Sequence, residues 1–168
     1  MKNCGRIMFW VLLISIIFTF ISCSPDNYKI PITNSIKEIE QAINENDLRR
    51  FSSQVSSTDL NKHFKIYSIF ASLFDKTDSS SNVINFIPVE FKASIFDSVK
   101  VNVSIEYKGT INVGKIQTLS NLLKKIIQIG MPDKATFKYK KIDNHYKLVD
   151  ISFGLAYDAL LSAADHIM

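Results

Sequence analysis

Cysteine is almost absent from this chain, which limits how its folded part is held together. The 168 residues include two cysteines, Cys4 and Cys23, and both lie in the N-terminal segment. The rest of the chain has no thiol with which to form a disulfide, so a hydrophobic core must stabilise it. About 135 residues suffice for one core, because a domain of that size buries about two thirds of its unfolded surface.

A strong excess of charge of one sign is also lacking. The chain is 46% hydrophobic and 21% charged, which is ordinary for one globular domain, and its net charge is +4. Of its 20 basic side chains, Lys2 and Arg6 lie in the N-terminal segment, so 18 remain against 16 acidic ones. This balance gives no electrostatic basis for nucleic-acid binding, and we expect no nucleic-acid partner.

Motifs of cofactor and metal chemistry are missing as well. The sequence has no His-Glu-x-x-His zinc motif, no pair of cysteine ligands, no glycine-rich phosphate loop and no Gly-x-Ser-x-Gly nucleophile turn. We therefore predict no cofactor, no metal site and no catalytic residue.

The N-terminal segment has the layout of a secretion signal. Lys2 and Arg6 form a basic start, and the uncharged, largely apolar run Ile7–Ile21 follows. At about 15 residues this run is shorter than the ~20 that span a bilayer as a helix, and it fits the hydrophobic region of a signal peptide. Residues 1–22 are therefore interpreted as a signal peptide.

The signal ends in Phe20-Ile21-Ser22-Cys23, which resembles the lipobox of bacterial lipoproteins. That resemblance implies that the sulfur of Cys23 receives a diacylglyceryl group, that signal peptidase II cleaves before Cys23, and that the freed amine is acylated. Ser22 and Cys23 match the pattern, whereas Phe20 stands where leucine is usual. Acyl chains contribute ~0.8 kcal/mol per buried methylene, so two or three of them would anchor the protein to a membrane.

Two alternatives to lipidation are an incidental thiol after an ordinary signal and an uncleaved membrane helix. The position of Cys23 at the hydrophobic-to-polar boundary, the small residue before it and the turn-forming Ser24-Pro25-Asp26-Asn27 favour the lipoprotein interpretation. Residues 23–33, with Pro25 and Pro31, are predicted to be a flexible tether.

Residues 34–168 are predicted to form a single α+β domain that begins with helices. Asn34 or Ser35 is expected to cap the first helix, with Glu38 completing a capping box. The first helix is expected to end at Asn46 in a left-handed conformation, and Asp47 to cap a second helix. A third helix is expected from Asp59 to Phe74, buried on most sides. The expected inward residues of the first two helices are Ile36, Ile39, Ile43, Leu48, Phe51 and Val55, and Lys37, Glu40 and Gln41 are expected to point away.

The hydrophobic period then changes from about 3.6 to 2, which predicts antiparallel strands. Apolar residues alternate with polar ones along 89–95 and 99–107, with a bend at 96–98. A helix over 115–130, a second hairpin over 137–153 with its turn at Asp143-Asn144, and a helix over 155–167 are expected to follow. The residues expected on the core face of the first hairpin are Val89, Phe91, Ala93, Ile95, Val99, Val101, Val103, Ile105 and Tyr107.

Helices followed by a curved antiparallel sheet resemble the nuclear-transport-factor-2-like (cystatin-like) superfamily over Ser35–Phe153. The matching features are the helix interrupted at Asn46-Asp47 and the last strand, Tyr146–Ile151, which reads aromatic-Lys-apolar-apolar-Asp-apolar. This resemblance implies a cone in which a helix crosses a concave sheet and leaves a pocket or groove. The stretch Asp150–Gly154 is also faintly similar to the C-terminal end of periplasmic phospholipid-shuttle proteins, although the helix over 115–130 and the lipid anchor depart from that family.

Few residues are candidates for chemistry. Asp150 is an acidic residue in an apolar strand, and beside His63 or His145 it would serve as a general base. The favoured interpretation places Asp150 on the exposed strand face, because Leu148 and Ser152 share its parity. His63 is expected to be packed or exposed, and His166 lies near the C-terminus. Lysines 134, 138, 140, 141 and 147 cluster on the second hairpin, either as a solvated edge or as a contact for an anionic membrane.

The leading hypothesis is a non-enzymatic, lipid-anchored cell-envelope protein that binds a hydrophobic ligand or a protein partner at the membrane surface. One alternative is a cone-fold enzyme of the isomerase, dehydratase or hydrolase type that uses Asp150 with a histidine. Another is an accessory subunit of an envelope complex. Ser24 after the cysteine favours the outer membrane over the inner one.

Overall fold

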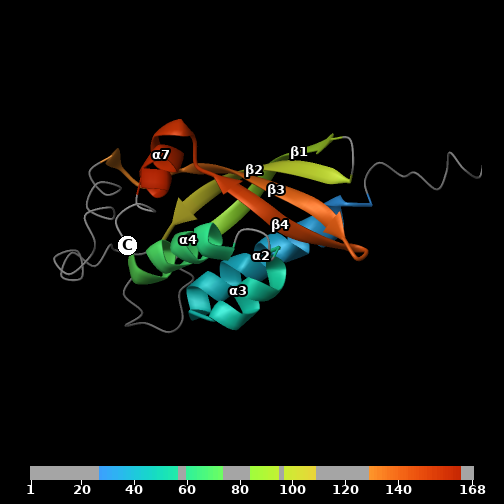
Figure 1. Ribbon diagram of the computed structural model, residues 1–168, viewed down its shortest axis with the longest axis horizontal. Coiled ribbons are helices and arrows are strands. Elements are labelled where there is room, and N and C mark those ends of the chain that lie inside the picture. Colours follow the sequence, from blue (N-terminus) through green and yellow to red (C-terminus); the bar gives the residue numbers. More distant parts are fainter. Residues whose placement is uncertain (1–26, 57–59, 74–83, 95–96, 109–128, 164–168) are drawn as a thin grey trace, which may run out of the picture.

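The protein is an α+β domain with helices before a four-stranded antiparallel sheet and a short helix after it (Figure 1), as predicted. A computed structural model describes residues 27–56, 60–73, 84–94, 97–108 and 129–163. Five predicted features lie outside the described residues: the predicted signal peptide, Cys23, His166, the predicted start of the third helix at Asp59, and nearly all of the helix expected over 115–130. The helices are α2 (Lys29–Glu45), α3 (Leu48–Gln54), α4 (Leu60–Leu73) and α7 (Leu155–Ala163).

Helix α2 begins earlier than predicted, so the tether over 23–33 is too long by the residues from Lys29 onward. Pro31 falls in the first helical turn, where its missing N–H costs nothing because that donor would have no partner inside the helix. Ile32 is fully buried and begins the stripe that continues through Ile36, Ile39 and Ile43. The predicted capping box is also wrong, because Ser35 is buried in mid-helix and donates to Gln54 Oε1 at 3.0 Å.

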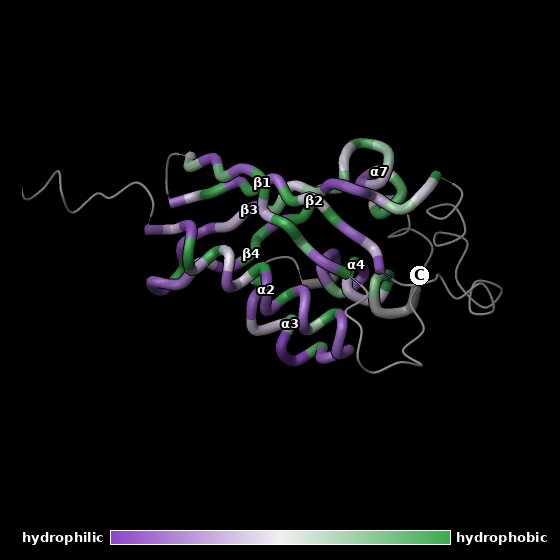
Figure 2. Tube along the Cα trace, turned by 180° about the vertical axis from the view of Figure 1, so that it is seen from behind, coloured by the Kyte–Doolittle hydropathy of each residue, from purple (hydrophilic) through white to green (hydrophobic). Residues whose placement is uncertain are grey.

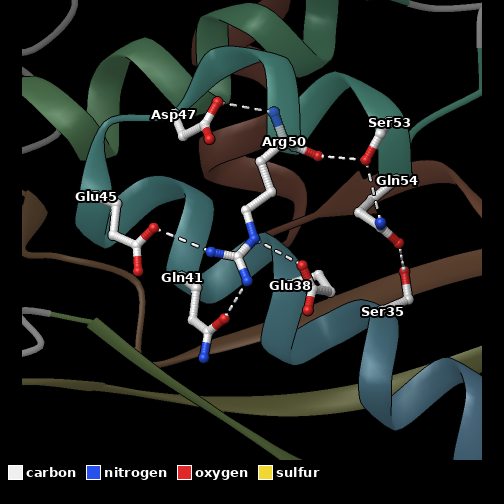
Figure 3. Close-up of polar contacts among 8 residues, drawn as sticks. All are labelled: Ser35, Glu38, Gln41, Glu45, Asp47, Arg50, Ser53 and Gln54. Atoms are coloured by element: carbon white, nitrogen blue, oxygen red, sulfur yellow. Dashed lines mark hydrogen bonds and ion pairs between the residues drawn. The ribbon is translucent and has the colours of Figure 1, made fainter.

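The break between α2 and α3 forms as predicted. Asn46 has φ = 57°, and the Asp47 side chain accepts a hydrogen bond from the backbone N–H of Arg50 at 2.9 Å. The Arg50 guanidinium then reaches back to α2 and donates to Glu38 (2.6 Å), Gln41 (2.5 Å) and Glu45 (3.0 Å), as Figure 3 shows. One arginine therefore joins the two helices through three side chains of α2.

Arg50→Ala is expected to lower the urea midpoint of unfolding, and the exposed neighbour Arg49→Ala is the matched control. The hydrogen bond from Arg50 lowers the pKa of Glu38 below its ordinary 4.5. A carboxyl with a lowered folded-state pKa stabilises the fold above its unfolded pKa, and this contribution is lost as pH falls through the folded value. The gap in urea midpoint between wild type and Arg50→Ala should therefore be present at pH 7 and shrink in acid. A gap independent of pH would contradict this assignment.

The sheet has the order β1-β2-β3-β4, and all neighbouring strands are antiparallel. The strands are β1 (Ile84–Ser94), β2 (Ser98–Tyr107), β3 (Lys134–Ile142) and β4 (His145–Ser152). Helices α2, α3 and α4 lie on one side of it (Figure 1), and Figure 2 shows hydrophobic and hydrophilic residues alternating along the strands. The prediction for β2 is confirmed, since its inward residues Val99, Val101, Val103 and Ile105 are all buried.

A bulge in β1 overturns part of the predicted face of that strand. Pro88 pairs with Val103 and Glu90 pairs with Asn102, so Val89 is an extra residue between them. An extra residue inverts the parity of a strand, so the buried residues before the bulge are Ile84 and Phe86. Val89, predicted to be inward, is 68% exposed. Pro88 is tolerated because β1 is an edge strand.

A second bulge lies in β4 at Val149, because Lys138 pairs with Asp150 whereas Tyr139 pairs with Leu148. Leu148 is therefore fully buried although it shares parity with Asp150, and the parity argument for Asp150 was wrong. The turn at Asp143-Asn144 is confirmed, with φ of 48° and 62°. Positive φ at both central residues suits a tight hairpin turn that follows the twist of the strands.

Both sheet edges are partly covered by the helical segment. On β1, Asn44 of α2 bonds both backbone groups of Ile84, at 2.8 and 3.0 Å, and Glu40 accepts from the N–H of Phe86 at 2.8 Å. Glu40 therefore does not point away as predicted. On β4, the backbone N–H of Ser56 donates to the carbonyl of Leu148 at 2.8 Å. These contacts occupy edge-strand N–H and C=O groups that would otherwise be free to pair with a strand of another molecule and lead to aggregation.

Candidate functional site

Asp150 is paired with a lysine and not with a histidine. It is opposite Lys138 on the sheet, is 44% exposed, and accepts from the Lys62 Nζ of α4 at 2.5 Å. His145 begins the same strand five residues earlier, which corresponds to ~16 Å along an extended chain. His63 follows Lys62 in α4, and its side chain is fully buried. Among the described residues, the Asp150–histidine pair needed for a cone-fold enzyme is therefore not formed.

The space between the helices and the sheet is filled by side chains. Tyr139, Phe137 and Phe51 are at most 1% exposed, and burial raises the pKa of the Tyr139 phenol. An apolar cavity between α4 and α7, with Phe70 and Leu161 in its lining, holds about 20 Å³. That volume suits about one water molecule, whereas ligand pockets usually hold about 300–1,000 Å³. This cavity is therefore too small for a hydrophobic ligand.

The opposite face of the sheet carries a row of charged residues across all four strands. Lys92, Lys100, Lys138 and Asp150 are register partners from β1 to β4. No helix in the described part of the chain lies over Lys92, Lys100 and Lys138, and all three are exposed. We call this surface, with the neighbouring exposed Lys134 and Lys140, the open face.

The positive charge of the open face is only partly neutralised. Lys92 pairs with Glu90 at 3.0 Å, and Asp150 is neutralised by Lys62. Lys100, Lys134, Lys138 and Lys140 form no ion pair with any described residue. The predicted lysine cluster is only partly on this face. Lys147 is the register partner of Lys140, but its ammonium group reaches the backbone carbonyl of Ser53, and Lys141 has the opposite parity to Lys140.

A hollow of about 520 Å³ lies at one end of the open face, and Val89, Lys134 and Phe153 belong to its lining. Asn102 crosses its floor, donating to Glu90 at 2.9 Å and accepting from Thr136 at 3.2 Å. At its rim, Ser152 donates to Asp158 of α7 at 2.5 Å. The floor is thus fixed by hydrogen bonds, while Val89 is free to contact a partner.

A polar groove of about 490 Å³ lies at the other end of the domain. It runs between the first turns of α2, the end of α3 and the β3–β4 turn. Lys147 donates to the backbone carbonyl of Ser53, and the ring Nδ1 of His145 contacts the Asp143 carbonyl oxygen at 2.8 Å. The groove is lined by Asn27, Pro31, Asn34, Ser35, Glu38, Gln54, Lys141, Asn144, His145, Tyr146 and Lys147.

Within the described residues, no group of three or more His, Cys, Asp or Glu side chains is placed to hold a metal ion. Among the same residues, no helix combines the length and the hydrophobicity of a membrane span. No protein-family model matches the chain, and no curated protein matches it.

Sequence reasoning found the lysines of β3 and β4 but missed both hollows. The alternation of Lys138 and Lys140 with Phe137 and Tyr139 was a readable signal of an exposed face. The groove is lined by residues that are more than a hundred positions apart, such as Asn27 and His145, so no local sequence pattern predicts it.

Proposed function

We propose that this protein is a lipid-anchored cell-envelope protein whose non-enzymatic domain binds an acidic protein partner through the open face. The observation that carries the proposal is the excess of lysine on a sheet face that no described helix covers. Complementary charge steers association and selects partners, and the exposed Val89 adds an apolar contact at the rim.

The early start of α2 supports a position close to the membrane. If Cys23 carries acyl chains, four peptide steps separate it from Asn27, and an extended chain covers at most ~14 Å in four residues. The first turn of α2, the last residues of β1, the first residues of β2 and the β3–β4 turn lie at one end of the molecule (Figure 1). That end would rest at the bilayer surface, and the outer membrane is the membrane that Ser24 favours.

In this placement the open face is perpendicular to the membrane surface. The strands run away from the anchored end, and ten residues of β2 cover about 30 Å. Lys100 is only the third residue of β2 and so would lie near the anchored end. Side chains stand roughly perpendicular to a sheet, however, so Lys100 and its register partner Lys138 would still face envelope proteins beside the domain. An acidic protein surface is therefore a better occupant of the open face than a membrane.

Site-specific photocrosslinking in cells tests this proposal. A photoreactive residue at Lys100 or Lys138 should give one discrete adduct, and the same residue at the exposed helix positions Arg49 or Ser68 should give none. Lys134→Glu with Lys140→Glu should remove the Lys138 adduct without changing the melting temperature. Equal adducts from the open face and the helices, or an adduct that survives charge reversal, would contradict the proposal.

A further inference from the structure

The groove beside the β3–β4 turn lies where the chain would leave the membrane. Asn27 and Pro31 are part of its lining, so the bound of ~14 Å between Cys23 and Asn27 also limits how far the groove lies from an acylated Cys23. A headgroup of the anchoring bilayer is therefore within reach of the groove without any conformational change.

The groove presents donors for an anion. Lys141 and Lys147 supply ammonium groups, and Tyr146 supplies a phenol. Burial raises the pKa of Tyr146, so this phenol stays protonated and can donate. Lys147 is held in place because it also donates to the Ser53 carbonyl.

The carboxylate that lines the groove does not cancel this charge. Glu38 accepts from Arg50 at 2.6 Å, and this hydrogen bond lowers the pKa of Glu38. Arg50, which also pairs with Glu45, offsets part of the negative charge of Glu38, and the two lysines of the groove outnumber this one carboxylate. The N-terminal end of α2 adds to the positive field, because Tyr28 gives its first turn no side-chain cap.

We propose that this groove binds the phosphate headgroup of an anionic phospholipid in the bilayer that holds the protein. The inference rests on the proposed anchoring of Cys23. The acyl chains hold the domain near the surface, and Lys141 and Lys147 clamp a headgroup beside α2. The two contacts together fix the orientation that turns the open face sideways.

Amide hydrogen exchange of the mature, acylated protein in lipid nanodiscs tests the groove. Nanodiscs that contain phosphatidylglycerol should slow exchange at 141–147 and at the first turn of α2, relative to phosphatidylcholine alone. For each lysine removed, by Lys141→Gln or Lys147→Gln, half-maximal protection should need about fivefold more phosphatidylglycerol. Lys100→Gln and Lys138→Gln on the open face are matched controls and should leave the protection unchanged. Lys141 is exposed, so Lys141→Gln remains informative if Lys147→Gln unfolds the protein.

The other outcomes separate the possible sources of the signal. Protection by inorganic phosphate added to phosphatidylcholine nanodiscs would assign the groove to a free anion and overturn the lipid assignment. Equal protection in both lipids would mean proximity without headgroup binding, and it would also overturn the inference. No protection in a protein whose acylation is verified by mass would overturn the headgroup site and leave the anchor intact. A mature protein without acyl chains would overturn the proposed function itself.

Discussion

Val101→Asp is expected to leave the protein unfolded. Val101 is fully buried and lies in register between Phe91 of β1 and Phe137 of β3. The substitution places a carboxylate among apolar side chains. An unpaired buried charge costs several kcal/mol, a large share of the about 5–15 kcal/mol that stabilises a domain. Far-UV circular dichroism of the mature protein in urea should show no cooperative transition.

Ser104→Asp is the matched control for this substitution. Ser104 lies three positions along the same strand, on the opposite face, with Lys134 as its register partner on β3. Its new carboxylate would meet water and a lysine, so stability should change by no more than about 1 kcal/mol. Asn102 is a poorer control, because Asn102→Asp would bring a second carboxylate to Glu90, which Asn102 now hydrogen-bonds. Equal damage from Val101→Asp and Ser104→Asp would mean that both faces of β2 are buried.

The contrast between β2 and β1 indicates how much of the fold could be predicted from the sequence. In β2 the alternation is unbroken from Val99 to Ile105, and each inward residue is buried as predicted. In β1 one extra residue, Val89, changes which alternate residues face the core. The prediction extended the alternation that follows the bulge back onto Val89, and this was wrong. Bulges depend on pairing with a partner strand, so the sequence of one strand does not reveal them.

Sequence patterns at helix ends predicted the structure correctly only where tertiary packing did not override them. Asn46 and Asp47 act through their own backbone and side chains, and both behave as predicted. Pro31 supported the prediction of a flexible tether over 23–33, whereas burial of Ile32 one residue later extends α2 through Pro31. Glu38 was taken as a capping residue, but it pairs with Arg50, twelve residues away in sequence.

The residues of the candidate surfaces were likewise predictable only where the signal is local in sequence. The lysines of β3 were found because strand alternation is local, but Lys92 and Lys100 join them only through the register of the sheet. Asp150 was assigned to the correct face for a wrong reason, since the bulge at Val149 places Asp150 and Leu148 on opposite faces although they share parity. Its partner Lys62 comes from a helix 88 positions earlier and could not be foreseen.

Cys23→Ala is expected to abolish lipid attachment. Acyl chains on Cys23 would supply the membrane affinity, at ~0.8 kcal/mol per buried methylene, and an alanine cannot accept them. Cells fed an alkyne fatty acid should label the wild type and not Cys23→Ala. Cys4→Ala, which removes the chain's other cysteine, should be labelled like the wild type. Globomycin, which inhibits signal peptidase II, should make the unprocessed wild-type precursor accumulate.

Intact-mass spectrometry of the detergent-extracted mature protein tests the lipid anchor most directly. The account predicts a chain that begins at Cys23 and is heavier than residues 23–168 by a diacylglyceryl group, with or without a further acyl chain. A chain that retains residues 1–22, or that begins near Cys23 without added lipid mass, would contradict it.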